Sequence, residues 1–248
     1  MRFFGLEYTE FEQKMQGMAA KNGLSALSDE VVQAFHSFAL YLLKVNQVTN
    51  LTAIRDVDGV ITKHFIDSLL LSPYIPQGAR VLDIGCGPGF PSLPLAIARS
   101  DLSITGLDST AKKIAFANEC ASLLSLKNMR AVVGRAEDSA TMKSLGEFDV
   151  VVSRAVANPI VLCELSLGYL KIGGKMLAMK GAMLEEETAS LNQSKILGIM
   201  GADHADCLGW SLFTESGEEA RGMIEVVKKR KGDPKYPRSY ATILKKPM

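Results

Sequence analysis

The 248-residue chain has no long uncharged apolar run and only four cysteines. No apolar stretch approaches the roughly eighteen residues that a membrane-spanning helix needs. The cysteines form no Cys-x-x-Cys pair, which argues against a disulfide framework or a clustered zinc site and favours a reducing compartment. Glu7, Glu10 and Glu12 lie among the first apolar residues, a pattern unlike that of a secretory signal. We therefore expect a soluble cytoplasmic protein with no membrane association and no metal.

The chain also lacks a strong net charge, because 28 Lys and Arg residues balance 27 Asp and Glu residues. The balance hides an asymmetry, since residues 221–248 carry a charge of +7 and the other 220 residues carry −6. A basic segment of this kind is either a solvated tail or a binding surface for a polyanion. Tyr236, Arg238 and Tyr240 favour nucleic acid, because aromatic and Arg side chains can stack on bases.

Hydrophobic periodicity divides the chain into a helical part and an α/β part. Helices are expected first at about residues 9–21, from residue 28 onward and at residues 56–71. In the first of them, Thr9 is expected as the N-cap, Glu12 as its capping-box partner and Gly23 as the stop. Short β-rich runs follow, at residues 80–84, 103–107, 130–133, 149–153, 175–179 and 223–227.

Helix-length segments separate most of these runs, and this alternation predicts a doubly wound, mostly parallel sheet of the α/β class. No internal repeat or low-complexity tract interrupts it. We expect a helical N-terminal extension over residues 1–75, an α/β domain over residues 76–230 and a basic C-terminal tail over residues 231–248.

A glycine-rich turn directly follows the first predicted strand. Residues 83–89 read Asp-Ile-Gly-Cys-Gly-Pro-Gly, and the helix that follows carries Pro91 in its first turn. Gly85 and Gly87 let the backbone approach a ligand closely. A dinucleotide fingerprint would place a third glycine where Phe90 stands. With Asp83 two residues before the first glycine, the run resembles the first motif of the Rossmann-like S-adenosylmethionine-dependent methyltransferases; a purely structural turn is the alternative.

Asp108 ends the second predicted strand, about twenty residues after the glycine turn, where a carboxylate can accept hydrogen bonds from ribose hydroxyls. In isolation it could equally cap the helix expected at residues 111–124. Residues 134–138, after the third strand, stand where methyltransferases commonly hold the adenine, and Ser-Arg-Ala at residues 153–155 follows the fourth.

Several segments, in order along the chain, resemble the signatures of one family. They read Asn-Leu-Thr-Ala-Ile-Arg-Asp at residues 50–56 and Lys-His-Phe-Ile-Asp-Ser at residues 63–68, and continue at residues 83–91, 107–109, 134–138, 153–155, 180–181, 236–238 and 245–247. They are similar to the RsmG (GidB) family of bacterial 16S rRNA guanine-N7 methyltransferases. The Asn-Leu-Thr-Ala and Ser-Arg-Ala blocks are not general to methyltransferases. The sequence departs from the family's usual residues at Val45, Cys86 and Ser92, none of which we assign to chemistry.

The resemblance implies a class I enzyme that moves a methyl group from S-adenosylmethionine to guanine N7, in the decoding-region loop of 16S rRNA or of the small ribosomal subunit. It implies cofactor contacts at Gly85, Phe90, Ala136, Glu137 and Arg154. The motif and ribose arguments add Asp83, Gly87 and Asp108. It further implies contacts to rRNA at Arg135, Lys180, Arg221 and Arg238. For Arg154 and Lys180 the alternative is a charge that simply reaches solvent at the sheet edge, and Arg221 could equally be a surface charge. No obligate protein partner is evident.

The reaction asks little of side chains, because guanine N7 has an exposed lone pair and carries no proton. Rate should come from alignment and exclusion of water. Arg154 is the first catalytic candidate; Asn50 is the second, as a residue pinning a loop over the cofactor, although it could also be a turn former. His64 is expected to be buried and hydrogen-bonded. In duplex RNA N7 lies in a deep, narrow groove, so the target guanine should be unstacked.

Motifs of other nucleic-acid methyltransferases are missing. Asn158-Pro159 continues into Ile160 rather than into the motif used for adenine N6, and Cys163 follows Leu162 rather than a proline, as cytosine C5 chemistry would need. Three rival functions remain at this point: an NAD-dependent dehydrogenase, a methyltransferase acting on another RNA or a small molecule, and a non-catalytic rRNA-binding assembly factor.

Overall fold

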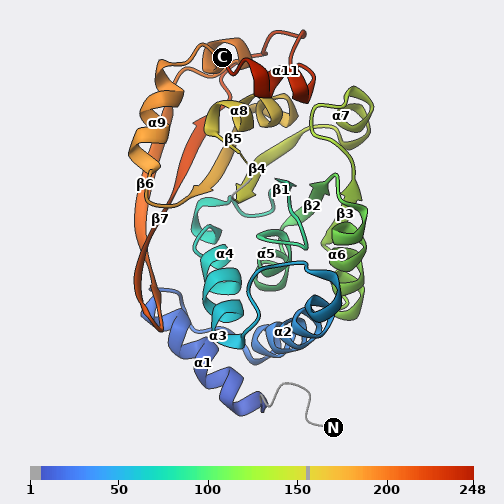
Figure 1. Cartoon of the computed structure of the whole chain (residues 1–248), viewed down its shortest axis with the longest axis vertical. Coiled ribbons are helices and arrows are strands. Elements are labelled where there is room, and N and C mark those ends of the chain that lie inside the picture. Colours follow the sequence, from blue (N-terminus) through green and yellow to red (C-terminus); the bar gives the residue numbers. More distant parts are fainter. Residues whose placement is uncertain (1–6, 155–156) are drawn as a thin grey trace.

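The computed structural model describes residues 7–154 and 157–248, and it is built around one seven-stranded sheet (Figure 1). The strands are β1 (Arg80–Ile84), β2 (Ser103–Asp108), β3 (Met129–Val133), β4 (Phe148–Arg154), β5 (Leu170–Lys180), β6 (Ala205–Thr214) and β7 (Gly217–Val227). Their order is β3-β2-β1-β4-β5-β7-β6. The first five are parallel, whereas β7 runs antiparallel to both β5 and β6. The order reverses between β1 and β4, and ligands of doubly wound folds bind at such a point.

Helices cover both faces of this sheet. After the N-terminal part, the α-helices are α5 (Ser92–Ala98), α6 (Ala111–Leu123), α7 (Ser139–Leu145), α8 (Pro159–Ser166), α9 (Leu184–Gln193), α10 (Ile196–Met200) and α11 (Tyr240–Lys245). Val81 packs in the core on one face and Leu82 in the core on the other, because successive strand side chains point to opposite faces. The predicted doubly wound sheet is confirmed.

The N-terminal helices belong to the core on one of these faces. They are α1 (Tyr8–Lys21), α2 (Asp29–Thr49) and a continuous helical stretch made of α3 (Val57–Gly59), the π-helix η1 (Val60–Ile66) and α4 (Asp67–Leu69). In α2, Phe38 stacks on Phe65 of the π-helix, and the ring of Phe35 contacts Phe65 at a tilt. The amide of Asn22, just after α1, exchanges two hydrogen bonds with the backbone of Phe213 in β6. Residues 7–75 therefore pack against the sheet on one side rather than standing apart from it.

Three local predictions differ from the structure. Glu7, not Thr9, precedes the first helix, so the predicted capping box is wrong, whereas Gly23 follows that helix with a positive φ of 73° as expected. The helix expected at residues 56–71 contains an unpredicted π-helical segment. Strand β6 was not predicted, because most of its side chains are exposed or only half-buried and form no apolar run.

The C-terminal residues fold back onto the α/β core. Lys228, counted in the basic segment of residues 221–248, is buried and donates hydrogen bonds to the carbonyls of Leu167 and Leu170. Ile243 of α11 is fully buried. Among the described residues, no helix is long and apolar enough to cross a membrane.

Candidate active site

The expected site residues meet at the carboxyl ends of the parallel strands. Gly85 follows β1, Asp108 ends β2 and Glu137 lies just after β3, while Arg154 ends β4 and Lys180 ends β5. Two cavities open at this edge. We call them the glycine-turn pocket and the arginine cavity after the residues that line them.

The glycine turn has the backbone geometry that its sequence predicts. Gly85, Gly87 and Gly89 have φ values of 71°, 55° and 106°, a region that side-chain-bearing residues rarely adopt. The backbone N–H of Gly87 donates to Oδ2 of Asp108 at 3.0 Å, and Thr110 donates its N–H to Oδ1 at 2.8 Å. Asp108 thus ties the turn to the start of the next helical segment, and its carboxylate oxygens keep lone pairs for further donors.

The glycine-turn pocket has a volume of about 200 Å³. Its lining includes Gly85, Asp108, Ala136 and Glu137, four of the residues expected to hold the cofactor, together with Leu165 and Tyr240. Arg135, expected to contact rRNA, also lines this pocket and forms a 3.6 Å ion pair with Glu137.

Asp83 lies beneath the turn and is fully buried. Oδ2 accepts hydrogen bonds from the backbone N–H of Ser92, at 3.2 Å, and from its hydroxyl. Oδ1 is buried without a hydrogen-bond partner. Burial raises the pKa of Asp83 to about 7, although the Ser92 hydrogen bonds and the charge of Arg154 oppose the shift. Asp83 lines neither cavity, but it directly precedes Ile84 and Gly85 of the pocket lining, and a buried negative charge there fits a ligand that brings a cationic group, such as the ammonium of S-adenosylmethionine.

Phe90, expected to contact the cofactor, lines neither cavity. Its ring stacks on the His64 imidazole with centroids 4.1 Å apart and on Phe38 at 5.5 Å. The Arg154 guanidinium lies over the same ring, 5.2 Å from its centroid. The side chain therefore joins the glycine turn to the helices on the other side of it.

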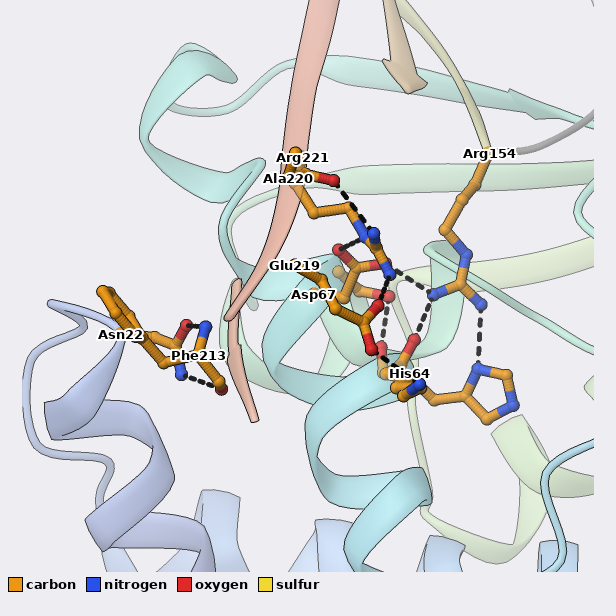
Figure 2. A network of polar contacts seen from close by, with 10 residues as sticks. Asn22, His64, Asp67, Arg154, Phe213, Glu219, Ala220 and Arg221 are labelled. Atoms are coloured by element: carbon orange, nitrogen blue, oxygen red, sulfur yellow. Dashed lines mark hydrogen bonds and ion pairs between the residues drawn. The ribbon is translucent and has the colours of Figure 1, made fainter. Parts of the chain in front are cut away.

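Arg154 is the centre of a buried polar network (Figure 2). Nη1 donates to the Lys63 carbonyl at 2.8 Å and lies 3.2 Å from Oδ2 of Asp67, while Nη2 lies 3.0 Å from Nδ1 of His64. Arginine has donors only, so Nδ1 must accept and the imidazole proton must sit on Nε2. Nε2 lies 2.8 Å from the Thr52 hydroxyl. Burial and the charge of Arg154 lower the pKa of His64 to about 3, so the ring stays neutral.

Asp67 links two arginines that come from distant parts of the chain. Figure 2 shows its carboxylate between Arg154 and Arg221, which lies on β7; Arg221 Nε is 3.4 Å from Oδ1. Burial raises the pKa of Asp67, and both guanidinium groups oppose that shift. Glu219 completes the network, because it pairs with Arg221 at 2.6 Å and with Lys63 at 2.7 Å.

The arginine cavity, of about 570 Å³, lies against this network. Its charged lining consists of Lys63, Asp67, Arg154, Lys180, Glu187 and Arg221. Lys180 donates to the Ala157 carbonyl at 2.8 Å and pairs with Glu187 at 3.2 Å. Three predicted residues therefore meet here, and the solvent-reaching alternative for Arg154 and Lys180 does not hold, because their side chains are only 15% and 10% exposed.

Sequence reasoning missed Lys63, Asp67 and Glu187. Lys63 and Asp67 lie within one of the family signatures, and their i, i+4 spacing on a helix could have placed them on one face. Glu187 carries no comparable signal, because it is one of three successive glutamates at the start of α9.

Four other predicted residues, Asp83, Gly87, Asn50 and Arg238, also line neither cavity. Asn50 ends α2 in the left-handed conformation, with a φ of 49°, and its exposed side chain accepts a hydrogen bond from Arg55. The buried Asn46 pins the loop instead, with four hydrogen bonds to the backbone of residues 51, 52 and 54. Arg238 pairs with Glu164, so its guanidinium is engaged inside the protein. Ala155, in the Ser-Arg-Ala block, lies outside the described residues.

The chain is similar to known proteins over most of its length. The family described as rRNA small subunit methyltransferase G matches residues 31–205. The protein named ribosomal RNA small subunit methyltransferase G in Leuconostoc citreum (strain KM20) is 38% identical over 228 residues, which cover 90% of this chain and 93% of that protein. The protein of the same name in Clostridium beijerinckii is 38% identical over 244 residues, 96% and 99% of the two chains. The chain belongs to the rRNA small subunit methyltransferase G family.

This membership confirms the family resemblance and the methyltransferase class predicted from the sequence. Solved structures agree on the fold. A methyltransferase from Pyrococcus furiosus superposes with a TM-score of 0.53 and 16% identity, over 80% of this chain and 98% of that one. A SAM-dependent methyltransferase from Aquifex aeolicus gives a TM-score of 0.50 and 17% identity, over 68% and 94%. In the described part of this family member, no three His, Cys, Asp or Glu side chains cluster to hold a metal ion.

Proposed function

We propose that this enzyme transfers a methyl group from S-adenosylmethionine to N7 of a guanine in 16S rRNA, acting in the cytoplasm on the small ribosomal subunit or its RNA. Family membership supports the reaction class. The observation that carries the proposal is the pairing of two cavities at one sheet edge. One is lined by the glycine turn and carboxylates, and the other has four basic and two acidic side chains in its lining.

The glycine-turn pocket suits the cofactor, which supplies a methyl group activated on a sulfonium sulfur. Asp108 stands where it can accept from ribose hydroxyls, and Ala136 and Glu137 stand at the adenine end. The positive φ of Gly85 and Gly87 lets the backbone lie close to the ligand. Asp83 lies behind the lining residues Ile84 and Gly85, and the negative charge of its ionised carboxylate would favour the ammonium group of the cofactor.

The arginine cavity suits a nucleotide of the RNA. Lys63, Lys180 and Arg221 offer donors to phosphate oxygens, and the buried pairs around Asp67 hold the guanidinium groups in place. The net charge of the lining is positive, which favours a polyanion.

The chemistry needs alignment more than proton transfer. The N7 lone pair forms the new N–C bond while the C–S bond breaks and its electron pair stays on sulfur, so no proton has to leave. A neutral His64 with a pKa of about 3 is consistent with this, because its role is to hold Arg154 by accepting a hydrogen bond. Arg154 spans the space between the turn and the cavity, since it contacts Phe90 and Asp67 at once. Such positioning is worth large factors in rate.

The test is transfer of labelled methyl from S-adenosylmethionine to small subunits and to naked 16S rRNA, both from a strain that lacks this gene. Chemical cleavage selective for N7-methylguanine would map the product. One labelled guanine at a single site is the expected result. Cofactor binding without transfer to either RNA substrate would make the substrate assignment wrong. Failure to bind the cofactor would favour an assembly protein that keeps only the fold.

A further inference from the structure

We propose that Tyr240, in the C-terminal segment, is a cofactor-contact residue that receives the adenosine half of S-adenosylmethionine, and that Arg238 positions it. This inference rests on the proposed function. It gives part of the basic C-terminal region a role at the cofactor, where the sequence had favoured a role in stacking on RNA bases.

Tyr240 lies at the pocket rather than on the outer surface. It lines the glycine-turn pocket together with Asp108, Ala136 and Glu137, the residues placed at the ribose and adenine. Its side chain is partly buried against the core that contains Leu165, which lines the same pocket. An aromatic ring in such a wall offers an adenine the stacking surface that proteins commonly use for bases.

An ion pair fixes the chain just before Tyr240. The backbone N–H and Nε of Arg238 donate to Oε1 of Glu164 at 2.8 and 2.9 Å, and Nη2 donates to Oε2 at 2.6 Å. Glu164 is only 1% exposed and precedes Leu165 in α8. A buried carboxylate held by a guanidinium fork is geometrically specific, because both oxygens are engaged in one plane.

A second anchor holds the chain just after Tyr240. Ile243 of α11 is fully buried in the same core. The two anchors lie two residues before and three residues after Tyr240, so the ring has little freedom to leave the pocket. The anchored segment thus supplies one wall of the pocket, and the carboxyl ends of β2 and β3 supply another.

The direct test measures binding of S-adenosylhomocysteine and of methylthioadenosine, which keeps the adenosine but lacks the amino-acid end, by titration calorimetry. Tyr240→Ala is expected to weaken both ligands by a similar factor of roughly ten, the order of one base–aromatic contact. Tyr240→Phe keeps the ring and should stay within about twofold of the unchanged protein. Leu244→Ala, on the same short helix but 55% exposed and outside the pocket, is the matched control.

Steady-state kinetics separate a cofactor role from an RNA role. Tyr240→Ala should raise KM for S-adenosylmethionine roughly tenfold and leave KM for the RNA substrate unchanged. Unaltered ligand affinity, or a rise confined to KM for RNA, would overturn the proposal. If the unchanged protein itself fails to bind S-adenosylmethionine, the proposed function fails instead, so the two failures are distinguishable.

A fluorescence measurement covers the case in which Tyr240→Ala does not fold. The chain has a single tryptophan, Trp210, which does not line the glycine-turn pocket. A Tyr240→Trp variant should therefore show a saturable emission change with methylthioadenosine that the unchanged protein lacks. Arg238→Lys, added to the Tyr240→Trp variant, loses the guanidinium fork but keeps the charge, and it should weaken this emission change. An identical emission change with and without Arg238→Lys would count against the positioning role of Arg238.

Discussion

The glycine-turn pocket and the arginine cavity lie at the same sheet edge but are built in different ways. The pocket is made largely of backbone and of side chains that directly follow β1, β2 and β3. The cavity depends on side chains brought from the π-helical stretch, the end of β4 and the middle of β7. One is assembled locally around turns, whereas the other is assembled from segments that are up to about 150 residues apart.

Their electrostatics differ as well. Behind the pocket wall, Asp83 keeps an unpaired buried oxygen, and in the lining Asp108 holds the turn by backbone hydrogen bonds. In the cavity, Arg154 is satisfied by three internal partners before any substrate arrives. This difference indicates that the pocket keeps hydrogen-bond acceptors free for a ligand, whereas the protein itself holds the buried arginine of the cavity in place.

The largest effect is expected from removing the charge between the two arginines. Asp67→Asn leaves Arg154 and Arg221 without a buried counter-charge and turns an amide donor toward one of them. Breaking a buried pair in this way typically costs about 3 kcal/mol or more. Urea unfolding would measure the loss. Asp58→Asn, whose partner Lys14 is exposed, is the control and should cost less than about 1 kcal/mol. Equal losses in the two variants would mean that the buried Asp67 network stabilises the fold no more than an exposed ion pair does.

Arg154→Ala should lower methyl transfer by at least roughly 100-fold, because the group that joins the turn to the cavity is lost. Arg154→Lys should recover little, since one ammonium cannot serve three separated acceptors in a planar arrangement. Arg130→Ala, on exposed β3 surface, is the matched control. Circular dichroism would verify folding, and near-normal turnover in folded Arg154→Ala would remove Arg154 from the site.

The pocket should show a pH dependence that originates at Asp83. Its pKa of about 7 in the free protein lies above the usual value of 3.8, so the carboxyl group is mostly protonated below pH 7, half ionised at that pH and mostly ionised about one unit above it. If the ammonium binds the ionised form, affinity for S-adenosylmethionine should rise roughly fivefold from pH 6 to pH 7 and then level off. Calorimetry at several pH values measures this.

Other charges near Asp83 define the control for that profile. Asp108 raises its pKa and Arg154 lowers it, and neutral His64 does not titrate in this range. Asp83→Asn should therefore flatten the profile. A slope that persists in this variant would assign the titration to another group.

The smallest effect is expected at Asn50. Its φ of 49° suits glycine, so Asn50→Gly should keep activity within about twofold, whereas Asn50→Ala should cost roughly 1 kcal/mol of stability. Methyl transfer and thermal unfolding would check both. More than a tenfold loss of activity in folded Asn50→Gly would restore Asn50 as a catalytic candidate.

Much of the pocket could be predicted because its signal is contiguous. The positive-φ glycines, Asp83 and Asp108 each stand at a fixed offset from a strand whose apolar run marks it. Prediction from local patterns failed for β6, because its half-exposed residues form no apolar run. It also failed for the N-cap at Thr9, because the helix begins at Tyr8 and has no side-chain cap. Periodicity indicated which residues were helical but not that residues 60–66 wind as a π-helix.

Arg154, Lys180 and Arg221 were predicted as separate charges, and nothing in their spacing indicated that Asp67 joins two of them. Arg238 and Tyr240 also show that the sequence does not reveal which side chains the fold brings together. Composition placed them on a basic surface, whereas the fold pairs Arg238 with Glu164 and sets Tyr240 in the lining of the glycine-turn pocket. The functional roles of the individual residues stay predictions.

By itself, the sequence determined the alternating α/β class, the glycine turn and the family, because each depends on residues that are close together along the chain. Only the tertiary structure decided which charges neutralise one another and which face a cavity. The physical reason is that a buried ion pair forms between side chains that packing brings together, and packing of the π-helix, β4, β7 and α8 is a property of the whole core.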